Sequence, residues 1–295
     1  MKSLLRGLTA TRRGRILTRV VFYGVAVFVG LPLGFSQVMI GTVRQPTRDP
    51  PAGWEETWVS SEGLRLRAWV REGETRRPAV VVVHGVGDTL ESYQGVAGVL
   101  AKRGHTVLLL DLRGHGRSEG KHMTLGGRER EDVRAAMNRL RASGLAENGL
   151  VLMGYSMGAV AVLRAAADQP DVRAVVAEAP FDTYRDTTRH HARLLYKLPG
   201  WVPLIPIAIA FAERRTGFDA DDVDAIAAAR RIRAPLFAIA DGADPRMPDA
   251  VVRRVFDAHA GPKRMWVAPG VDHVGALFHP EYWPRVLAFL DESGL

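Results

Sequence analysis

The chain has 295 residues, of which 47% are hydrophobic, and is long enough to bury the core of a large domain. The net charge of +8 arises within the first 48 residues, which contain eight basic residues and no acidic one. From Asp49 onward the chain carries 32 basic and 32 acidic residues, so the folded part lacks the basic excess expected of a nucleic-acid-binding protein. The absence of cysteine excludes disulfides, thiolate metal sites and a cysteine nucleophile.

An apolar segment without charges, residues 20–43, follows a basic leader, residues 1–19. A helix of this length is sufficient to cross a hydrocarbon core of about 30 Å, which requires about 20 residues. We therefore predict a transmembrane signal anchor over 20–43. Six Lys and Arg precede the segment and two follow it shortly, so the positive-inside rule places the leader in the cytoplasm and the rest of the chain outside the cell membrane.

Two alternatives to an anchor are a buried helix and a cleaved signal peptide. The small residues around Gly34 and Ser36 provide a possible cleavage site, which would give a secreted protein. The apolar run, however, exceeds the roughly 7–15 residues of a usual signal-peptide core. We favour the uncleaved anchor, followed by a short stiff linker over 44–53 that is rich in proline.

The remaining residues, 54–295, show the pattern of an α/β domain. An alternating hairpin around Glu62 and Gly63 comes first. Six short apolar runs then alternate with helical patterns, as expected for a mostly parallel sheet covered by helices on both faces. These runs span residues 79–84, 106–111, 149–154, 172–178, 235–241 and 264–268.

The interval 181–224 interrupts this alternation, because it contains helical patterns and prolines but no strand pattern. Ligands of open α/β sheets bind at the carboxyl ends of the strands, so an insertion at this point is expected to form a helical lid over a pocket. Its segment Trp201 to Phe211 is unusually apolar. It is interpreted either as a lid helix packed on the core or as a surface that binds acyl chains close to the bilayer.

The sequence Gly154-Tyr155-Ser156-Met157-Gly158 lies between an apolar strand pattern and an alanine-rich helix pattern. This is the strand-turn-helix context of a nucleophile elbow. Glycines on either side permit the sharp turn that presents the serine hydroxyl above the sheet. We therefore predict that Ser156 is a catalytic nucleophile.

A serine nucleophile requires a base, and the base requires an orienting acid. His273 lies in the loop after the last strand pattern, where the chain returns to the carboxyl edge of the sheet. The loop after the preceding strand supplies Asp244, which completes the chain order Ser156, Asp244, His273. Asp241, still within the strand pattern, and Asp272, adjacent to the base, are alternative orienting acids.

An oxyanion intermediate requires preorganised NH donors. The residue after the nucleophile, Met157, supplies one backbone NH. The glycine-containing motif HGVGD after the first apolar run supplies the second, which we assign to Val86. His84, in the same motif, is expected to brace the loop.

These motifs resemble those of the α/β-hydrolase superfamily over residues 54–295. The matching stretches are HGVGDT, DLRGHGRSEG, GYSMGA, GADPRMP and DHVGALFHPEYWPRVLAFLDE. Further stretches, including GLRLRAWV and EAPFDTYRDTTRHHA, together with the basic and apolar N-terminus, resemble bacterial membrane-anchored hydrolases described as serine aminopeptidase-like. The family usually has glycine at the position of Asp241, which leaves two aspartates as possible orienting acids.

The sequence thus predicts a serine hydrolase that acts on apolar or lipid-like carboxylic esters, with no cofactor and no metal. A thioesterase and an aminopeptidase are the alternative enzymes. An aminopeptidase would require an acidic group for the substrate ammonium, for which Glu178 and Glu213 are candidates. A catalytically silent fold that serves as a membrane-tethered binding protein is the alternative from another functional class.

Overall fold

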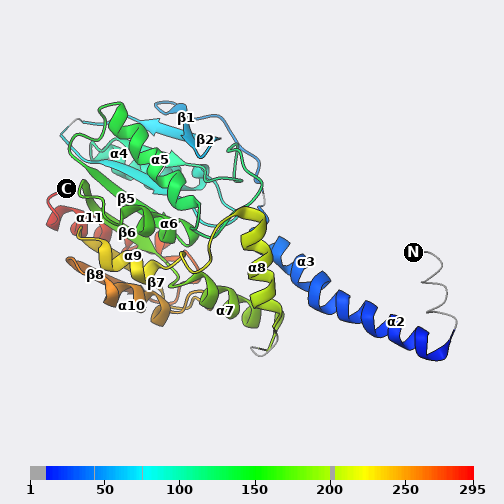
Figure 1. Cartoon of the computed structure of the whole chain (residues 1–295). Helices are drawn as coiled ribbons and strands as arrows, with labels where there is room; N and C mark the ends of the chain where they lie inside the picture. The colour runs from blue at the N-terminus through cyan, green and yellow to red at the C-terminus, as the bar shows by residue number, and fades with distance from the viewer. Residues whose placement is uncertain (1–10, 43, 75, 200–202) are drawn as a thin grey trace.

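A computed structural model describes residues 11–42, 44–74, 76–199 and 203–295. Its centre is an eight-stranded sheet in the order β1-β2-β4-β3-β5-β6-β7-β8, with helices on both faces (Figure 1). The first two strands form the antiparallel hairpin, β2 is antiparallel to β4, and the other neighbours are parallel. The strands are β1 (Glu55–Ser61), β2 (Leu64–Arg71), β3 (Ala79–Val83), β4 (Val107–Leu110), β5 (Leu150–Tyr155), β6 (Val172–Glu178), β7 (Leu236–Asp241) and β8 (Lys263–Ala268). The predicted fold class is confirmed.

The central strands are apolar on both sides because two layers of helices cover them. In β3, Val81 and Val83 belong to one apolar core, and Val80 and Val82 belong to the other. The first core includes side chains of α5 (Glu129–Ala142), α6 (Met157–Ala166), α9 (Ala225–Arg231) and α10 (Asp249–Ala258). The second core includes side chains of α4 (Gln94–Lys102) and α11 (Tyr282–Glu292).

The predicted insertion consists mainly of two helices, α7 (Tyr184–Tyr196) and α8 (Leu204–Thr216). An isolated β-bridge between Thr183 and Asp224 joins the two ends of this segment. The interval therefore leaves the sheet after β6 and returns to its starting point before α9. Residues 201 and 202 of the predicted apolar lid segment lie outside the described residues.

A long helix precedes the domain and projects from it (Figure 1). It runs from Arg12 to Ile40 as α2 (Arg12–Val25), a π-helical turn (Ala26–Gly30) and α3 (Leu31–Ile40). Its length and composition are those of a membrane-spanning helix, and a signal sequence would share them. The helix begins within the predicted leader, of which residues 1–10 lie outside the described part of the chain.

The two halves of this helix have different surroundings. None of the residues of α2 is buried, whereas α3 buries Pro32, Ser36, Met39 and Ile40. In Figure 1, α3 lies beside α8 of the insertion, with which it makes extensive contacts. The second half of the apolar segment is therefore part of the folded domain.

The segment 44–53 contains no helix or strand, but hydrogen bonds hold it against the domain. The guanidinium of Arg44 donates to the carbonyl oxygens of Gly116 (2.7 Å) and Gly120 (3.1 Å). The backbone NH of Arg48 donates to a carboxylate oxygen of Glu91 at 2.6 Å. These bonds attach the segment that follows the helix to the domain.

Candidate active site

Ser156 occupies a strained turn between β5 and α6. Its backbone angles are φ 52° and ψ −117°, a conformation that costs a non-glycine residue about 1–3 kcal/mol. A Cβ atom on Gly154 would lie 2.6 Å from the carbonyl carbon of Gly158, and one on Gly158 would lie 2.5 Å from the carbonyl oxygen of His84. Both glycines are therefore required for this turn.

Three side chains from three different loops meet at this turn. The hydroxyl Oγ of Ser156 lies 2.8 Å from Nε2 of His273, and Nδ1 of His273 lies 2.6 Å from Oδ2 of Asp244. The parallel strands β5, β7 and β8 end at the same edge of the sheet, which is why residues so distant in sequence come together. The arrangement permits proton transfer from the hydroxyl to the imidazole.

Asp244 is held as a carboxylate. Its side chain is fully buried, and burial, the largest single effect, would raise its pKa, but the hydrogen bond from His273 and the other lowering interactions together outweigh it. The backbone NH groups of Arg246 (2.7 Å) and Met247 (3.1 Å) donate to its other oxygen and contribute to the lowering. The net result is a pKa of Asp244 below its ordinary value, so the group is ionised at neutral pH.

The two alternative acids have other partners. Asp241 accepts hydrogen bonds from the backbone NH groups of Val274 and Ala276, both at 2.8 Å. Asp272 accepts from the backbone NH of His273 at 2.7 Å. Asp241 and Asp272 thus hold the backbone of the His273 loop, while Asp244 contacts the imidazole.

Glu178, at the end of β6, lies beneath the same loop. It is fully buried and accepts the backbone NH of Leu277 at 3.2 Å. Burial and the neighbouring carboxylate of Asp241 raise the pKa of Glu178 well above its ordinary value, and burial raises the pKa of Asp241 to about 6. Two buried carboxyl groups in contact favour a shared proton. Glu178 is therefore inaccessible to a substrate ammonium.

One group of side chains has the composition of a metal site. Ligand atoms of Asp241, Asp244 and His273 lie within 4.8 Å of one another. Both ring nitrogens of His273, however, already have partners, as do both oxygens of Asp241. A cation would have to displace these bonds, so the residues fit proton transfer better than metal binding.

The predicted oxyanion donors flank the nucleophile. Met157 is the first residue of α6, so its backbone NH has no acceptor within the helix. Val86 follows Gly85, and a Cβ atom on Gly85 would lie 3.3 Å from Cβ of Ser156. The HGVGD loop therefore passes close enough to the serine for its backbone to approach a bound acyl group.

His84 braces this loop, as predicted. Its Nδ1 lies 2.7 Å from the carbonyl oxygen of Gly85, to which it donates, and its Nε2 accepts the backbone NH of Leu112 at 3.1 Å. Burial lowers the pKa of His84, so the ring is neutral and its two nitrogens have opposite roles.

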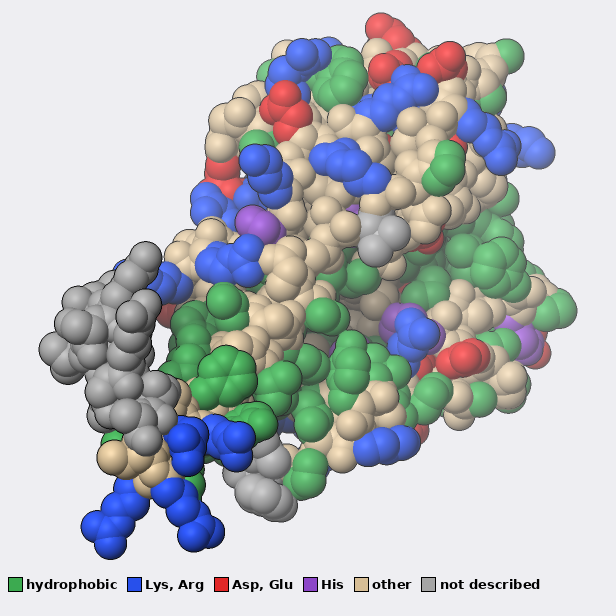
Figure 2. Space-filling model, turned by 90° about the vertical axis from the view of Figure 1, so that its right-hand side faces the viewer, with side chains coloured by type: hydrophobic (Ala, Val, Ile, Leu, Met, Phe, Trp, Pro, Cys, Tyr) green, Lys and Arg blue, Asp and Glu red, His purple; other side chains and the backbone are tan. Residues whose placement is uncertain are grey.

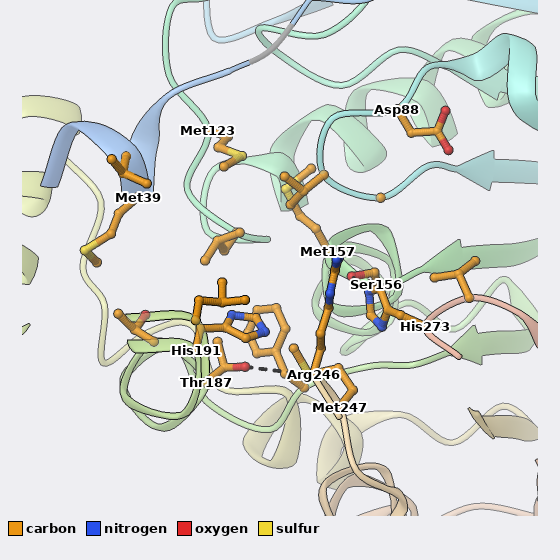
Figure 3. Close-up of a pocket in the computed structure, with 18 of the residues that line it drawn as sticks. Met39, Asp88, Met123, Ser156, Met157, Thr187, His191, Arg246, Met247 and His273 are labelled. Atoms are coloured by element: carbon orange, nitrogen blue, oxygen red, sulfur yellow. Dashed lines mark hydrogen bonds between the residues drawn. The ribbon is translucent and has the colours of Figure 1, made fainter. Parts of the chain in front are cut away.

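Ser156 and His273 open into a cavity of about 580 Å³. Its lining is largely apolar and comes from segments far apart in the sequence (Figure 3). Its apolar residues include Phe35, Val38 and Met39 of α3, Leu195 and Tyr196 of α7, and Phe278. The contribution of α3 was not predicted, because its residues were assigned to the membrane segment.

Sequence reasoning also missed three polar residues of the lining. Arg246 is exposed, and in Figure 3 its side chain extends into the cavity. Its place in GADPRMP, two residues after Asp244, is the signal that could have identified it. Burial, followed by the charges of His190 and His273, lowers the pKa of His191 to about 4, so His191 is neutral at physiological pH. Asp88 lies at the edge of the cavity (Figure 3).

Residues 74–214 match the model of a protein family described as serine aminopeptidase, S33. Together with the sheet order and the turn at Ser156, this match supports the assignment of the chain to the α/β-hydrolase superfamily. The predicted resemblance is confirmed at this level.

Two relatives and one solved structure illustrate the similarity. The uncharacterized protein YqkD of Bacillus subtilis is 30% identical over 66% of this chain, and the match spans only 64% of the length of YqkD. Thiohydrolase AneE of Aspergillus aculeatus is 32% identical over 43% of this chain and 41% of its own length. The esterase Pf2001 of Pyrococcus furiosus has 24% identity and a TM-score of 0.69 over 86% of this chain and 98% of its own, which shows a shared fold.

Replacing Glu178 tests the shared proton. A carboxyl group whose pKa is higher in the folded than in the unfolded protein stabilises the fold below its unfolded pKa of about 4. This stabilisation is lost as the pH rises through the folded pKa, because the unfolded chain releases the proton at a lower pH. We expect Glu178→Gln, which keeps a neutral donor, to lose less thermal stability than the parent between about pH 4 and 7. Melting curves over this range measure the difference. Parallel curves for the two proteins would contradict the shared proton, and the exposed Glu281→Gln is the control.

Proposed function

We propose that the protein is a serine hydrolase of carboxylic esters with apolar acyl groups. The observation that carries this proposal is the pair of contacts from Ser156 to His273 and from His273 to Asp244 at the wall of an apolar cavity. The strained conformation of Ser156 supports a catalytic role, since strain of this kind persists where the surrounding structure maintains it for function.

In the proposed mechanism, Nε2 of His273 takes the proton from the Ser156 hydroxyl as Oγ attacks the ester carbonyl. Asp244 holds the imidazole in the required tautomer and stabilises its protonated form. The backbone NH groups of Met157 and Val86 stabilise the oxyanion. His273 then protonates the leaving alcohol, and a water molecule, deprotonated by the same ring, releases the acid from Ser156.

The apolar lining favours an acyl ester over an N-terminal peptide. An aminopeptidase site needs a free carboxylate for the substrate ammonium. Glu213 does not line the cavity and accepts the backbone NH of Ala220 at 2.9 Å, while Asp88, at the edge of the cavity, has one oxygen occupied by the NH of Thr89 at 2.8 Å. A thioester is the second candidate substrate, since the similar thiohydrolase of Aspergillus aculeatus is named for that chemistry.

Substitutions in the three predicted catalytic residues test the mechanism. We expect the native protein to be labelled by a fluorophosphonate probe and Ser156→Ala to lose this labelling. Asp244→Asn should reduce kcat by about 10⁴-fold, because the imidazole would adopt the wrong tautomer. The matched control, Asp272→Asn, should stay within about tenfold of the parent, since Asp272 contacts only a backbone NH. An unlabelled but folded native protein would instead support a non-catalytic binding role.

A substrate panel separates the enzyme classes. We expect nitrophenyl esters of medium and long acids to be hydrolysed with a higher kcat/KM than acyl-coenzyme A thioesters and aminoacyl nitroanilides, because the lining buries acyl chains. Initial rates measured on one preparation give the comparison. A preference for nitroanilides with a free amino terminus would contradict the esterase proposal.

We also propose that the helix Arg12–Ile40 is a retained single-pass anchor with the domain outside the cytoplasm. The basic residues that precede its apolar run support this orientation. Ser36, in the alternative cleavage site, is fully buried within the folded domain, which is unfavourable for cleavage after folding. We expect added protease to degrade the domain in spheroplasts and the membrane-bound chain to retain its N-terminus by mass spectrometry. A protected domain, or a mature chain that begins near Gln37, would contradict these assignments.

A further inference from the structure

The N-terminal helix and the cavity share a wall. Phe35, Val38 and Met39 of α3 line the cavity into which Ser156 opens. The ring of Phe35 packs edge-to-face on that of Tyr196 of α7, with centroids 5.2 Å apart. The apolar helix therefore has a second role beyond membrane attachment, because its end encloses the space next to the nucleophile.

The length of the N-terminal helix determines how deep in the bilayer the cavity wall formed by α3 would lie. Between Arg19 and Pro32, the first buried residue of α3, there are twelve uncharged residues, which form about 18 Å of helix. A hydrocarbon core of about 30 Å requires about 20 residues. A spanning helix therefore has to place part of α3 at membrane depth as well, and α3 brings the rim of the cavity with it.

The exposed side chains at the rim of the cavity are largely apolar, as expected for a surface that contacts the bilayer. Beyond the N-terminal helix, five large apolar side chains of the described residues are exposed, and four of them line this cavity. These four are Val86, Leu195, Tyr196 and Phe278, and Phe278 is 84% exposed. Figure 2 views the face from which the helix projects and shows hydrophobic side chains gathered over its lower half. Exposed apolar clusters of this kind mark contacts with proteins or membranes.

We propose that the substrate is an acyl ester of a membrane lipid and that its chain passes from the bilayer into the cavity along α3. This inference rests on the ester hydrolysis proposed above. Val38, which is 58% exposed, and Leu195 border the route, while Ser156 and His273 lie at its inner end. Entry from the bilayer keeps the acyl chain in apolar surroundings throughout, so that only the ester group has to leave the lipid.

A charged side chain introduced on α3 tests the proposed route of the acyl chain. The full-length protein in phosphatidylcholine nanodiscs is assayed with nitrophenyl palmitate and nitrophenyl acetate. We expect Val38→Glu to lower the ratio of the two kcat/KM values, palmitate over acetate, by about tenfold or more, because the long chain has to pass a carboxylate. Trp58→Glu places the same charge at an exposed aromatic residue on β1, far from the cavity, and should leave the ratio unchanged.

The outcomes separate this inference from the proposed function. An active parent whose ratio is unaffected by Val38→Glu would overturn the route along α3 while leaving ester hydrolysis intact. A parent that hydrolyses neither ester and resists the fluorophosphonate probe would overturn the proposed function, and the route with it.

The position of the rim is measured independently of activity. The chain has no cysteine, so Phe278→Cys or Trp58→Cys introduces a single site for an environment-sensitive nitrobenzoxadiazole label. In nanodiscs we expect the label at position 278 to emit at shorter wavelength and to be quenched by nitroxide lipids. The label at position 58 should respond as in water. Equal responses at the two positions would show that the rim does not meet the bilayer and would overturn the proposal.

Discussion

The site depends on one constraint, the positive φ of Ser156 at the end of β5. This conformation directs the hydroxyl away from the sheet and places the start of α6 directly behind it. It exists because Gly154 and Gly158 leave room for neighbouring backbone and because the NH of Ser156 donates to the carbonyl oxygen of Glu178 at 2.9 Å. The turn is thus determined by the central strands, which are the most deeply buried part of the molecule.

His273 is positioned by hydrogen bonds to the backbone of its loop. His273 lies on an irregular loop that has no strand or helix of its own to fix it. Backbone NH groups at Val274, Ala276 and Leu277 donate to the carboxyl groups of Asp241 and Glu178. A buried acid pair therefore holds the loop, and the loop holds the imidazole between Asp244 and Ser156.

The sheet and the three loops were predictable because they follow local rules. Runs that are apolar on both faces indicate parallel strands, and the order of Ser156, Asp244 and His273 follows from strands that end at one edge. The separate roles of Asp241 and Asp244 were not predictable, since only two residues lie between them and only the distances in the structure distinguish them. The wall formed by Phe35 and Val38 was missed because hydropathy measures transfer out of water and does not distinguish lipid from the interior of a protein.

The packing of α3 makes the second half of the helix part of the domain. Full burial of Ile40 and near-complete burial of Met39 contribute about 1.5–3 kcal/mol each, and the hydrogen bonds of Arg44 fix the chain directly after them. A flexible linker would leave the orientation of the domain free, whereas these contacts hold α3 in one orientation relative to the domain. Once the helix spans a bilayer, the position of the cavity rim follows from its length. In the proposed arrangement, the same apolar segment both attaches the protein to the membrane and forms the wall along which the substrate reaches Ser156.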